Sequence, residues 1–287
     1  MTTATSTWPT GWSGSTTARS DRRCPVDRRW LAGLAPSPHA ELRLFCLPYA
    51  GSGAVVYRDW PGVLPRHVQV CPVELPGRGT RFGEAAFTRL APLVNALADA
   101  LDGALDRPFA LFGHSMGGLV AYELARTLRR RARPQPAHLL VSAAAAPGTA
   151  PAQPLVHCAA ERDVKHRLRE LNGTPRELLD NEELMAVMLP TIRADFAVLE
   201  TYEYREEPPL PVPITVFGGT GDPVVPLSKL NGWRDHSAVG CRLRLFSGDH
   251  FFLHSAATEV IHAVTQILRP TRPADHLTGS AAPWGKR

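Results

Sequence analysis

The sequence predicts one α/β domain, with a doubly wound, mostly parallel sheet and a helical insertion. Short apolar segments rich in β-branched residues alternate with helix-like segments, which is typical of parallel sheets covered by helices. The chain has 287 residues and is 44% hydrophobic, so it is long enough for one large core. Strands are expected at residues 42–47, 69–74, 109–112, 138–143, 214–217 and 242–246.

The pattern divides the chain into a core with an insertion and two flanking segments. We expect the core over residues 26–150 and 208–269, and a helical lid over 151–207, where no strand candidate occurs. Residues 1–25 lack the basic start and apolar centre of a secretory signal, so a disordered leader is expected there, and a disordered tail over 270–287. No apolar run approaches the roughly 18 residues of a membrane span, so no membrane partner is expected.

The first predicted strand ends in a turn that can bind negative charge. Residues 48–53 read Pro-Tyr-Ala-Gly-Ser-Gly, and glycine-rich turns expose backbone N–H groups. We expect the N–H of Ala50, with Tyr49 as second choice, to be one donor of an oxyanion hole. A phosphate loop is disfavoured, because neither G-x-x-x-x-G-K-[ST] nor G-x-G-x-x-G is present.

The third predicted strand leads into a G-x-S-x-G turn, Gly113 to Gly117, before a helix that begins near Leu119. A serine at a strained strand-to-helix turn is pushed out of the sheet and can act as a nucleophile. The helix contributes N–H groups and the positive end of its dipole. Ser115 is therefore the predicted nucleophile, and the N–H of Met116 the other oxyanion donor.

A serine nucleophile needs a base and a group that orients the base, and both have candidates after the last two strands. In α/β-hydrolases the order along the chain is serine, acid, histidine. Asp222 follows the strand at 214–217, and His250 follows the strand at 242–246 and precedes a helix over about 256–268. Asp222 precedes Pro223, so a turn-forming role is its alternative.

Other candidates are weaker. Asp249 is adjacent to His250 and points elsewhere in an extended loop, so a turn role is expected. Asp180 and Asp195 fall in the insertion. His114 precedes the serine and is expected to pack or to hydrogen-bond behind the site. No metal site is expected, because partner spacing is lacking around His157, His166, His236 and His254.

The insertion carries apolar residues near helical spacing. One interpretation is ordinary helix packing onto the body, and the other is a lid whose apolar face lines a substrate channel. The candidate substrate-binding residues of that face are Met185, Met188, Leu189, Ile192 and Phe196.

Charge and cysteine content exclude some functions. The net charge of +5 is carried mostly by arginine, and a run from Arg126 to Arg133 is interpreted as a solvated helix end. Nucleic acid is not an expected partner, since no binding motif is present. Five cysteines without C-x-x-C favour a reducing cytoplasm.

Five segments together resemble the type II thioesterases, the stand-alone editing hydrolases of polyketide and nonribosomal peptide biosynthesis. The segments are Leu47–Gly51 (LPYAG), Leu75–Arg81 (LPGRGTR), Gly113–Gly118 (GHSMGG), Gly218–Asp222 (GGTGD) and Gly248–Leu253 (GDHFFL). Residues 189–196 and 202–204 also resemble the lid of that family. The resemblance spans about residues 30–268 and departs from the usual pattern at Gly51-Ser52-Gly53 and at Gly248-Asp249-His250, outside the three triad positions.

The resemblance implies an α/β-hydrolase fold, with Ser115 as nucleophile, Asp222 as acid, His250 as base, and Ala50 and Met116 as oxyanion donors. It implies hydrolysis of acyl groups from the phosphopantetheine arm of an acyl or peptidyl carrier protein, with no cofactor of its own; a monomer is favoured.

Three alternatives stay open: acyl transfer or cyclisation by the same triad, a general carboxylesterase, and a non-catalytic carrier-binding adaptor. Hydrolysis is favoured over transfer because no carrier domain precedes the site in this sequence.

Overall fold

The structure is a computed structural model that describes residues 26–33, 37–149, 155–174 and 176–270. The expected leader, residues 1–25, lies outside these ranges, as does the expected tail apart from residue 270. Within the described ranges, no helix combines the length and the apolar character that crossing a bilayer requires.

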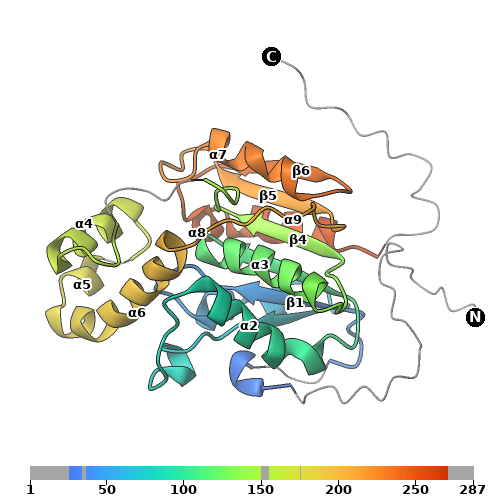
Figure 1. Ribbon diagram of the computed structural model, residues 1–287, viewed down its shortest axis with the longest axis horizontal. Helices are drawn as coiled ribbons and strands as arrows, with labels where there is room; N and C mark the ends of the chain where they lie inside the picture. The colour runs from blue at the N-terminus through green and yellow to red at the C-terminus, as the bar shows by residue number, and fades with distance from the viewer. Residues whose placement is uncertain (1–25, 34–36, 150–154, 175, 271–287) are drawn as a thin grey trace, which may run out of the picture.

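A six-stranded sheet forms the centre of the protein (Figure 1). The strands are β1 (Leu42–Leu47), β2 (Val68–Pro72), β3 (Phe109–His114), β4 (His138–Ser142), β5 (Ile214–Gly219) and β6 (Cys241–Phe246). Their order is β2-β1-β3-β4-β5-β6, and every neighbouring pair is parallel. The predicted parallel α/β sheet is confirmed, and each expected strand occurs within two residues of its predicted limits.

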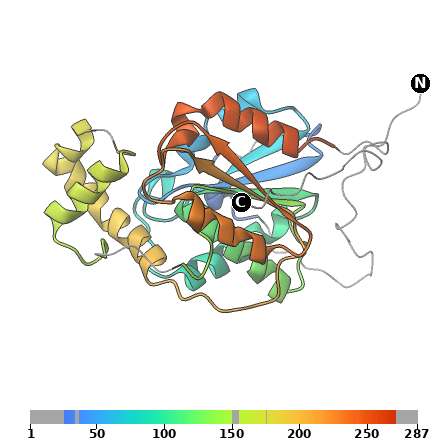
Figure 2. The same ribbon diagram turned by 90° about the horizontal axis from the view of Figure 1, so that it is seen from above.

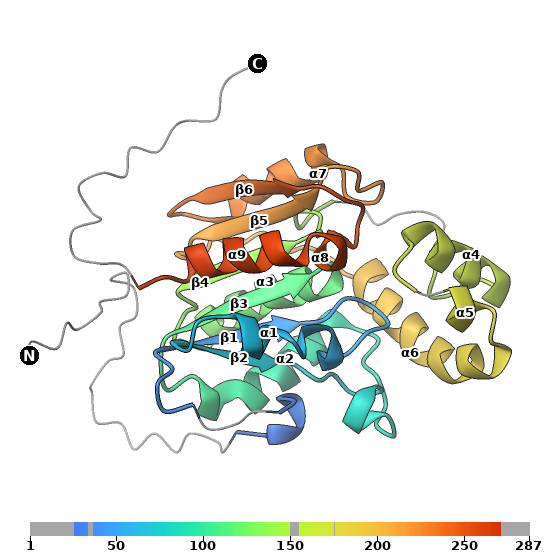
Figure 3. The same cartoon turned by 180° about the vertical axis from the view of Figure 1, so that it is seen from behind.

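Helices cover both faces of the sheet (Figures 2 and 3). On one face lie α2 (Leu90–Leu101) and α3 (Met116–Arg130), and on the other α1 (Trp60–Val63) and α9 (Ala257–Ile267). The short helices α7 (Leu227–Asn231) and α8 (Phe252–Ser255) follow β5 and β6. Because parallel strands end at the same edge, the loops after β1, β3, β5 and β6 meet there.

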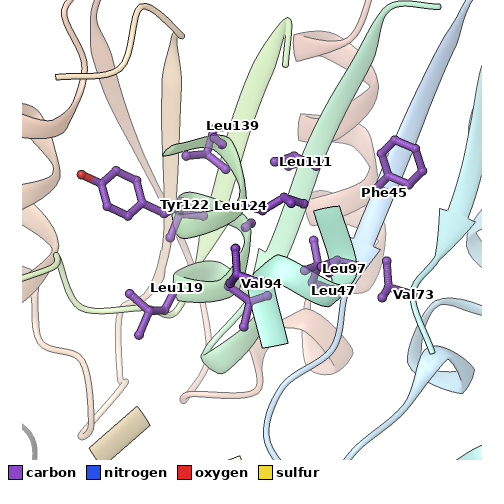
Figure 4. Close-up of a cluster of buried hydrophobic side chains, with 14 of the residues drawn as sticks. Phe45, Leu47, Val73, Val94, Leu97, Leu111, Leu119, Tyr122, Leu124 and Leu139 are labelled. Atoms are coloured by element: carbon purple, nitrogen blue, oxygen red, sulfur yellow. The ribbon is translucent and has the colours of Figure 1, made fainter. Parts of the chain in front are cut away.

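Alternation along the strands builds two separate hydrophobic layers. Phe45 and Leu47 of β1 face the layer beneath α2 and α3, whereas Leu44 and Cys46 face the layer beneath α1 and α9. Figure 4 shows the first layer, where strand residues meet Leu124 of α3. Each fully buried leucine or phenylalanine stabilises the fold by about 1.5–3 kcal/mol. These layers fix the strand ends on which the site is built.

The insertion between β4 and β5 consists of α4 (Glu161–Leu171), α5 (Arg176–Leu179) and α6 (Glu182–Glu200) in the residues described. It projects from one end of the sheet as a separate lobe (Figures 1 and 2). The side chain of Asn181 caps α6 by accepting a hydrogen bond from the N–H of Leu184 at 3.0 Å. The lobe has a small core of its own, which includes Val164, Leu168 and Met185.

Candidate active site

Ser115 occupies the sharp turn between β3 and α3 and has a strained backbone, with φ of +52° and ψ of −115°. Its N–H donates to the carbonyl oxygen of Ser142 at 2.7 Å, which ties the turn to β4. A Cβ atom at Gly113 would lie 2.0 Å from the carbonyl oxygen of Gly117, and one at Gly117 would lie 2.2 Å from that of Leu47. The two glycines therefore allow the backbone approach that holds the serine at the strand end.

Ser115, His250 and Asp222 form one hydrogen-bonded chain. Nε2 of His250 lies 3.0 Å from Oγ of Ser115, and Nδ1 lies 2.8 Å from Oδ2 of Asp222. Oδ1 of Asp222 accepts from the N–H groups of Val224 and Val225 at 2.8 and 3.0 Å. Three side chains from three loops thus meet in the predicted order and geometry.

The environment of Asp222 keeps it ionised. Burial acts to raise its pKa, but hydrogen bonds from His250 and from the two backbone N–H groups outweigh this and leave the pKa below its ordinary value. A carboxylate at this position can orient the imidazole ring and stabilise a positive charge on it.

His114 is fully buried behind this chain. Its Nε2 lies 3.0 Å from the carbonyl oxygen of His250, and its Nδ1 lies 2.9 Å from Oγ of Ser142. Burial, followed by the proximity of His250, holds the pKa of His114 well below its ordinary value. The neutral ring therefore donates from Nε2 and accepts from the Ser142 hydroxyl at Nδ1. This is the hydrogen-bonding role expected from the sequence.

Aromatic rings surround His250 on the side of the β1 loop. Tyr49 packs edge-on against Phe251 and His254, with ring centres 5.0 and 5.9 Å apart, and its hydroxyl lies 3.1 Å from Nε2 of His254. Phe251 in turn packs edge-on against His250 at 5.2 Å. This packing restricts the base to few orientations.

The other acidic candidates contact different partners. Asp249 accepts from the N–H of Phe251 at 2.8 Å, as a turn residue does. Asp180 pairs with an arginine of α4. Asp195 forms a buried ion pair with Arg78, a partner that sequence spacing did not indicate, although Arg78 lies within the LPGRGTR segment.

A cavity of about 800 Å³ lies between the strand ends and the helical insertion, and both Ser115 and His250 line it. The loop after β4 contributes a run of small residues, Ala143 to Gly148. The insertion contributes an apolar set, Leu155, Val156, Ala159, Leu168, Leu171, Phe196 and Leu199, and a polar set, Asp163, His166, Arg167, Glu170 and Glu200. The reactive hydroxyl thus faces a chamber with a large apolar wall.

The five candidate lid residues divide into two groups. Phe196 lines the cavity and is also part of the small core of the insertion. Met185 and Ile192 are buried in the small core of the insertion, and Met188 and Leu189 pack against that core. None of these four lines the cavity, so the structure favours helix packing over substrate contact for them.

The two expected oxyanion donors come from the loop after β1 and from the first turn of α3. Ala50 lines the same cavity as Ser115. Met116 is the first residue of α3, and the first N–H groups of a helix lack partners within it. Their role in binding an oxyanion stays a prediction.

The arginine run at the end of α3 differs from the solvated helix end expected from the sequence. Arg126 is buried and pairs with Glu123, while Arg129 and Arg130 both pair with Glu207. Glu123 lies in α3 itself and Glu207 in the segment after α6, so ion pairing rather than solvent satisfies much of this charge.

No set of three histidine, cysteine, aspartate or glutamate side chains in the described ranges is arranged to hold a metal ion.

Comparison with known proteins agrees with this geometry. The family model described as "Thioesterase domain" matches residues 42–268. The chain is 41% identical to linear gramicidin dehydrogenase LgrE of Brevibacillus parabrevis, over 84% of this chain and 93% of the relative.

Two solved structures are also similar. The thioesterase RedJ from the prodiginine pathway of Streptomyces coelicolor has a TM-score of 0.76 and 35% identity, covering 82% of this chain and 96% of RedJ. The type II thioesterase BorB from the borrelidin cluster has a TM-score of 0.77 and 34% identity, covering 86% of this chain and all of BorB. The chain therefore belongs to the thioesterase family, has its α/β-hydrolase fold, and is a relative of the type II thioesterases.

Proposed function

We propose that this thioesterase uses Ser115, His250 and Asp222 to hydrolyse acyl groups from the phosphopantetheine arm of an acyl or peptidyl carrier protein. The observation that carries the proposal is the hydrogen-bonded chain of these residues, whose serine faces the cavity. Such an enzyme would edit or release chains in the biosynthesis of a polyketide, a nonribosomal peptide or a related metabolite.

The first half of the reaction acylates the serine. Oγ of Ser115 attacks the thioester carbonyl carbon while its proton passes to Nε2 of His250, 3.0 Å away. Asp222 holds Nδ1–H of the ring and stabilises the imidazolium that forms. The C–S bond then breaks, and the leaving sulfur takes the proton from Nε2 of His250, so the thiol departs and the imidazole is again neutral. The sulfur leaves readily because thiol pKa values lie near 8.5.

The second half returns the enzyme to its starting state. Water gives a proton to Nε2 of His250 and attacks the acyl-serine carbonyl, and the proton then passes to Oγ of Ser115 as the free acid leaves. In both halves the N–H groups of Met116 and Ala50 are proposed to bind the oxyanion. Loss of one such donor typically costs about 10²–10³-fold in rate.

The substrate class rests on the cavity and on the relatives. A chamber of about 800 Å³ has room for a substrate of drug-like size, and its apolar wall suits an alkyl or aryl acyl group. RedJ and BorB are described as enzymes of metabolite pathways. The relative LgrE is named as a dehydrogenase, but this chain has no G-x-G-x-x-G fingerprint for a dinucleotide.

We further propose a cytoplasmic location. The four cysteines in the described residues, Cys46, Cys71, Cys158 and Cys241, carry free thiols, which suits a reducing compartment.

Release of free acid from a panel of acyl carrier protein thioesters tests the proposal, with the native protein compared with Ser115→Ala. Broad hydrolysis that disappears in the variant is expected. Hydrolysis that persists in Ser115→Ala would contradict the role of the serine. Faster turnover of p-nitrophenyl esters than of carrier thioesters would favour a carboxylesterase, and products with added amines or alcohols would favour acyl transfer.

A further inference from the structure

Helix α6 of the insertion places one buried carboxylate against the loop after β1. Oδ2 of Asp195 accepts a hydrogen bond from the N–H of Gly51 at 2.7 Å. Gly51 has a φ of +77° and directly follows Ala50, which lines the cavity with Ser115. A residue of the insertion therefore contacts the loop that faces the nucleophile.

Arg78 holds this carboxylate in a fixed orientation. Its Nη1 and Nη2 donate to Oδ2 and Oδ1 of Asp195 at 2.6 and 2.7 Å, which is a two-point contact. Nη1 also donates to the carbonyl oxygen of Ser52 at 3.0 Å. The side chains of Arg78 and Asp195 are only 9% and 3% exposed. The pair thus binds the 51–52 segment at an N–H and at a carbonyl.

We propose that Arg78 and Asp195 are positioning residues that set the oxyanion hole by fixing the loop at Gly51. This inference rests on the proposed function, in which Ala50 supplies an oxyanion donor. With the Gly51 N–H bound to Asp195 at the back of the loop, the preceding peptide is held with its Ala50 N–H available to the cavity. Helix α6 is then a structural part of the catalytic centre as well as a cavity wall.

The charge of the pair supports this role. A carboxylate near the oxyanion would oppose the negative charge that develops on it, and Arg78 neutralises that carboxylate at direct contact. Two-point geometry also resists rotation of Asp195, so the loop is held in one position. A displacement of about 1 Å in such a site can cost about 10²-fold in rate.

A second contact between α6 and the core offers a matched control. Oγ1 of Thr191, one helical turn before Asp195, donates to the carbonyl oxygen of Gly77 at 2.8 Å. This bond joins the same helix to the core but does not contact Gly51. Thr191→Val therefore weakens the attachment of the insertion without altering the oxyanion loop.

The test compares native protein, Asp195→Asn and Thr191→Val with three readouts. These are kcat on an acyl carrier thioester, affinity for an acyl trifluoromethyl ketone, and affinity for the matching non-hydrolysable thioether. The ketone forms a tetrahedral adduct with the serine and needs the oxyanion hole, whereas the thioether binds the same cavity without it. For Asp195→Asn we expect kcat and ketone affinity to fall together by about 10–100-fold, with thioether affinity within twofold. Thr191→Val should change all three by less than threefold.

A double variant, Arg78→Met with Asp195→Leu, keeps the test valid if the single change prevents folding. Replacing both charges by apolar residues of similar size often preserves stability, yet it removes the acceptor for Gly51. The same selective loss of kcat and ketone affinity is expected.

Native kcat and ketone affinity in a folded variant would overturn the positioning role. An equal loss of thioether affinity would also overturn it, since that result indicates a collapsed cavity. If the native protein binds the ketone but does not hydrolyse thioesters, the thioesterase mechanism alone is overturned. If it neither binds the ketone nor hydrolyses thioesters, both proposals are overturned.

Discussion

Nε2 of His114 lies 3.0 Å from the backbone carbonyl oxygen of His250, so the residue before the serine holds the loop that carries the histidine. The same ring contacts Ser142 at the end of β4 through Nδ1. His114 therefore links the end of β3 to the end of β4 and to the loop after β6, and the position of His250 depends on a side chain that does not line the cavity.

Replacing His114 by Phe should lower both stability and turnover. A phenyl ring has similar size but leaves the hydroxyl of Ser142 and the carbonyl of His250 without their buried partner, at a cost of about 2–4 kcal/mol in the free energy of unfolding. Urea denaturation and kcat on a carrier thioester check this. His254→Phe removes the hydrogen bond to the Tyr49 hydroxyl and is the control. It should lower the free energy of unfolding by less than His114→Phe does. Native kcat in His114→Phe would show that His250 needs no such support.

Gly117→Ala should destabilise the protein strongly, by more than about 3 kcal/mol, because the new methyl group would lie 2.2 Å from the carbonyl oxygen of Leu47. The matched control is Gly62→Ala, since a Cβ at Gly62 meets no atom within 4 Å. Its free energy of unfolding should stay within about 1 kcal/mol of the native value. Equal stability of the two variants would mean that the strand end can move to accept a side chain.

The sequence was enough to predict the strands and the three residues that meet at their ends. The strands are short runs rich in apolar residues, and Ser115, Asp222 and His250 each follow such a run at a glycine-containing turn. In a parallel sheet, residues at strand ends become neighbours without any knowledge of side-chain packing. The order serine, acid, histidine along the chain then assigned the catalytic role of each residue.

Long-range side-chain pairs could not be predicted in this way. Arg78 and Asp195 are 117 positions apart and lie on a loop and on the insertion, so no periodicity relates them. For the same reason the sequence did not separate Phe196 from Ile192: both belong to the core of the insertion, but only Phe196 also lines the cavity. A small change in helix rotation decides between these environments, and only packing fixes that rotation.

Stability should decline between pH 6.5 and pH 4, partly through His138. Burial, with a smaller effect of Arg242, lowers the pKa of His138 to about 4. Below pH 6.5 the unfolded chain therefore binds a proton at this residue that the native state excludes, and stability falls as the pH falls. At pH 5 this amounts to about 2 kcal/mol.

The effect of His138 can be isolated with His138→Gln, whose amide can still hydrogen-bond to Oγ1 of Thr215. Urea denaturation at pH 7 and pH 5 should show a loss on acidification that is about 2 kcal/mol smaller in the variant than in the native protein. An identical loss in both would place the pH dependence elsewhere, for example on His114.

Asp222→Asn should reduce kcat by about 10³–10⁴-fold while the serine hydroxyl and the cavity stay in place. The amide no longer favours the tautomer of His250 that accepts a proton at Nε2.

Stability gives a second readout for Asp222→Asn. The lowered pKa of Asp222 means that its carboxylate stabilises the fold above its ordinary pKa of 3.8 and loses this effect as the pH falls through the lower native value. The variant should therefore lose less stability between pH 5 and pH 2. A kcat within tenfold of the native value would contradict the assignment of the acid.

Phe196→Ala should change which acyl groups are preferred, because Phe196 lines the cavity that Ser115 faces. Removing the ring enlarges the chamber, so long or branched acyl groups should gain in kcat/KM relative to short ones. The expected gain is about 10-fold for an acyl group that is one or two methylenes longer.

Met185→Leu is the control. Met185 is fully buried in the core of the insertion, and its replacement by a side chain of similar volume should leave the order of substrates unchanged. The measurement is kcat/KM over a series of acyl carrier thioesters of increasing chain length. If Met185→Leu reorders the series and Phe196→Ala does not, the acyl group contacts the face of α6 that packs within the insertion, and the cavity wall assigned to Phe196 is wrong.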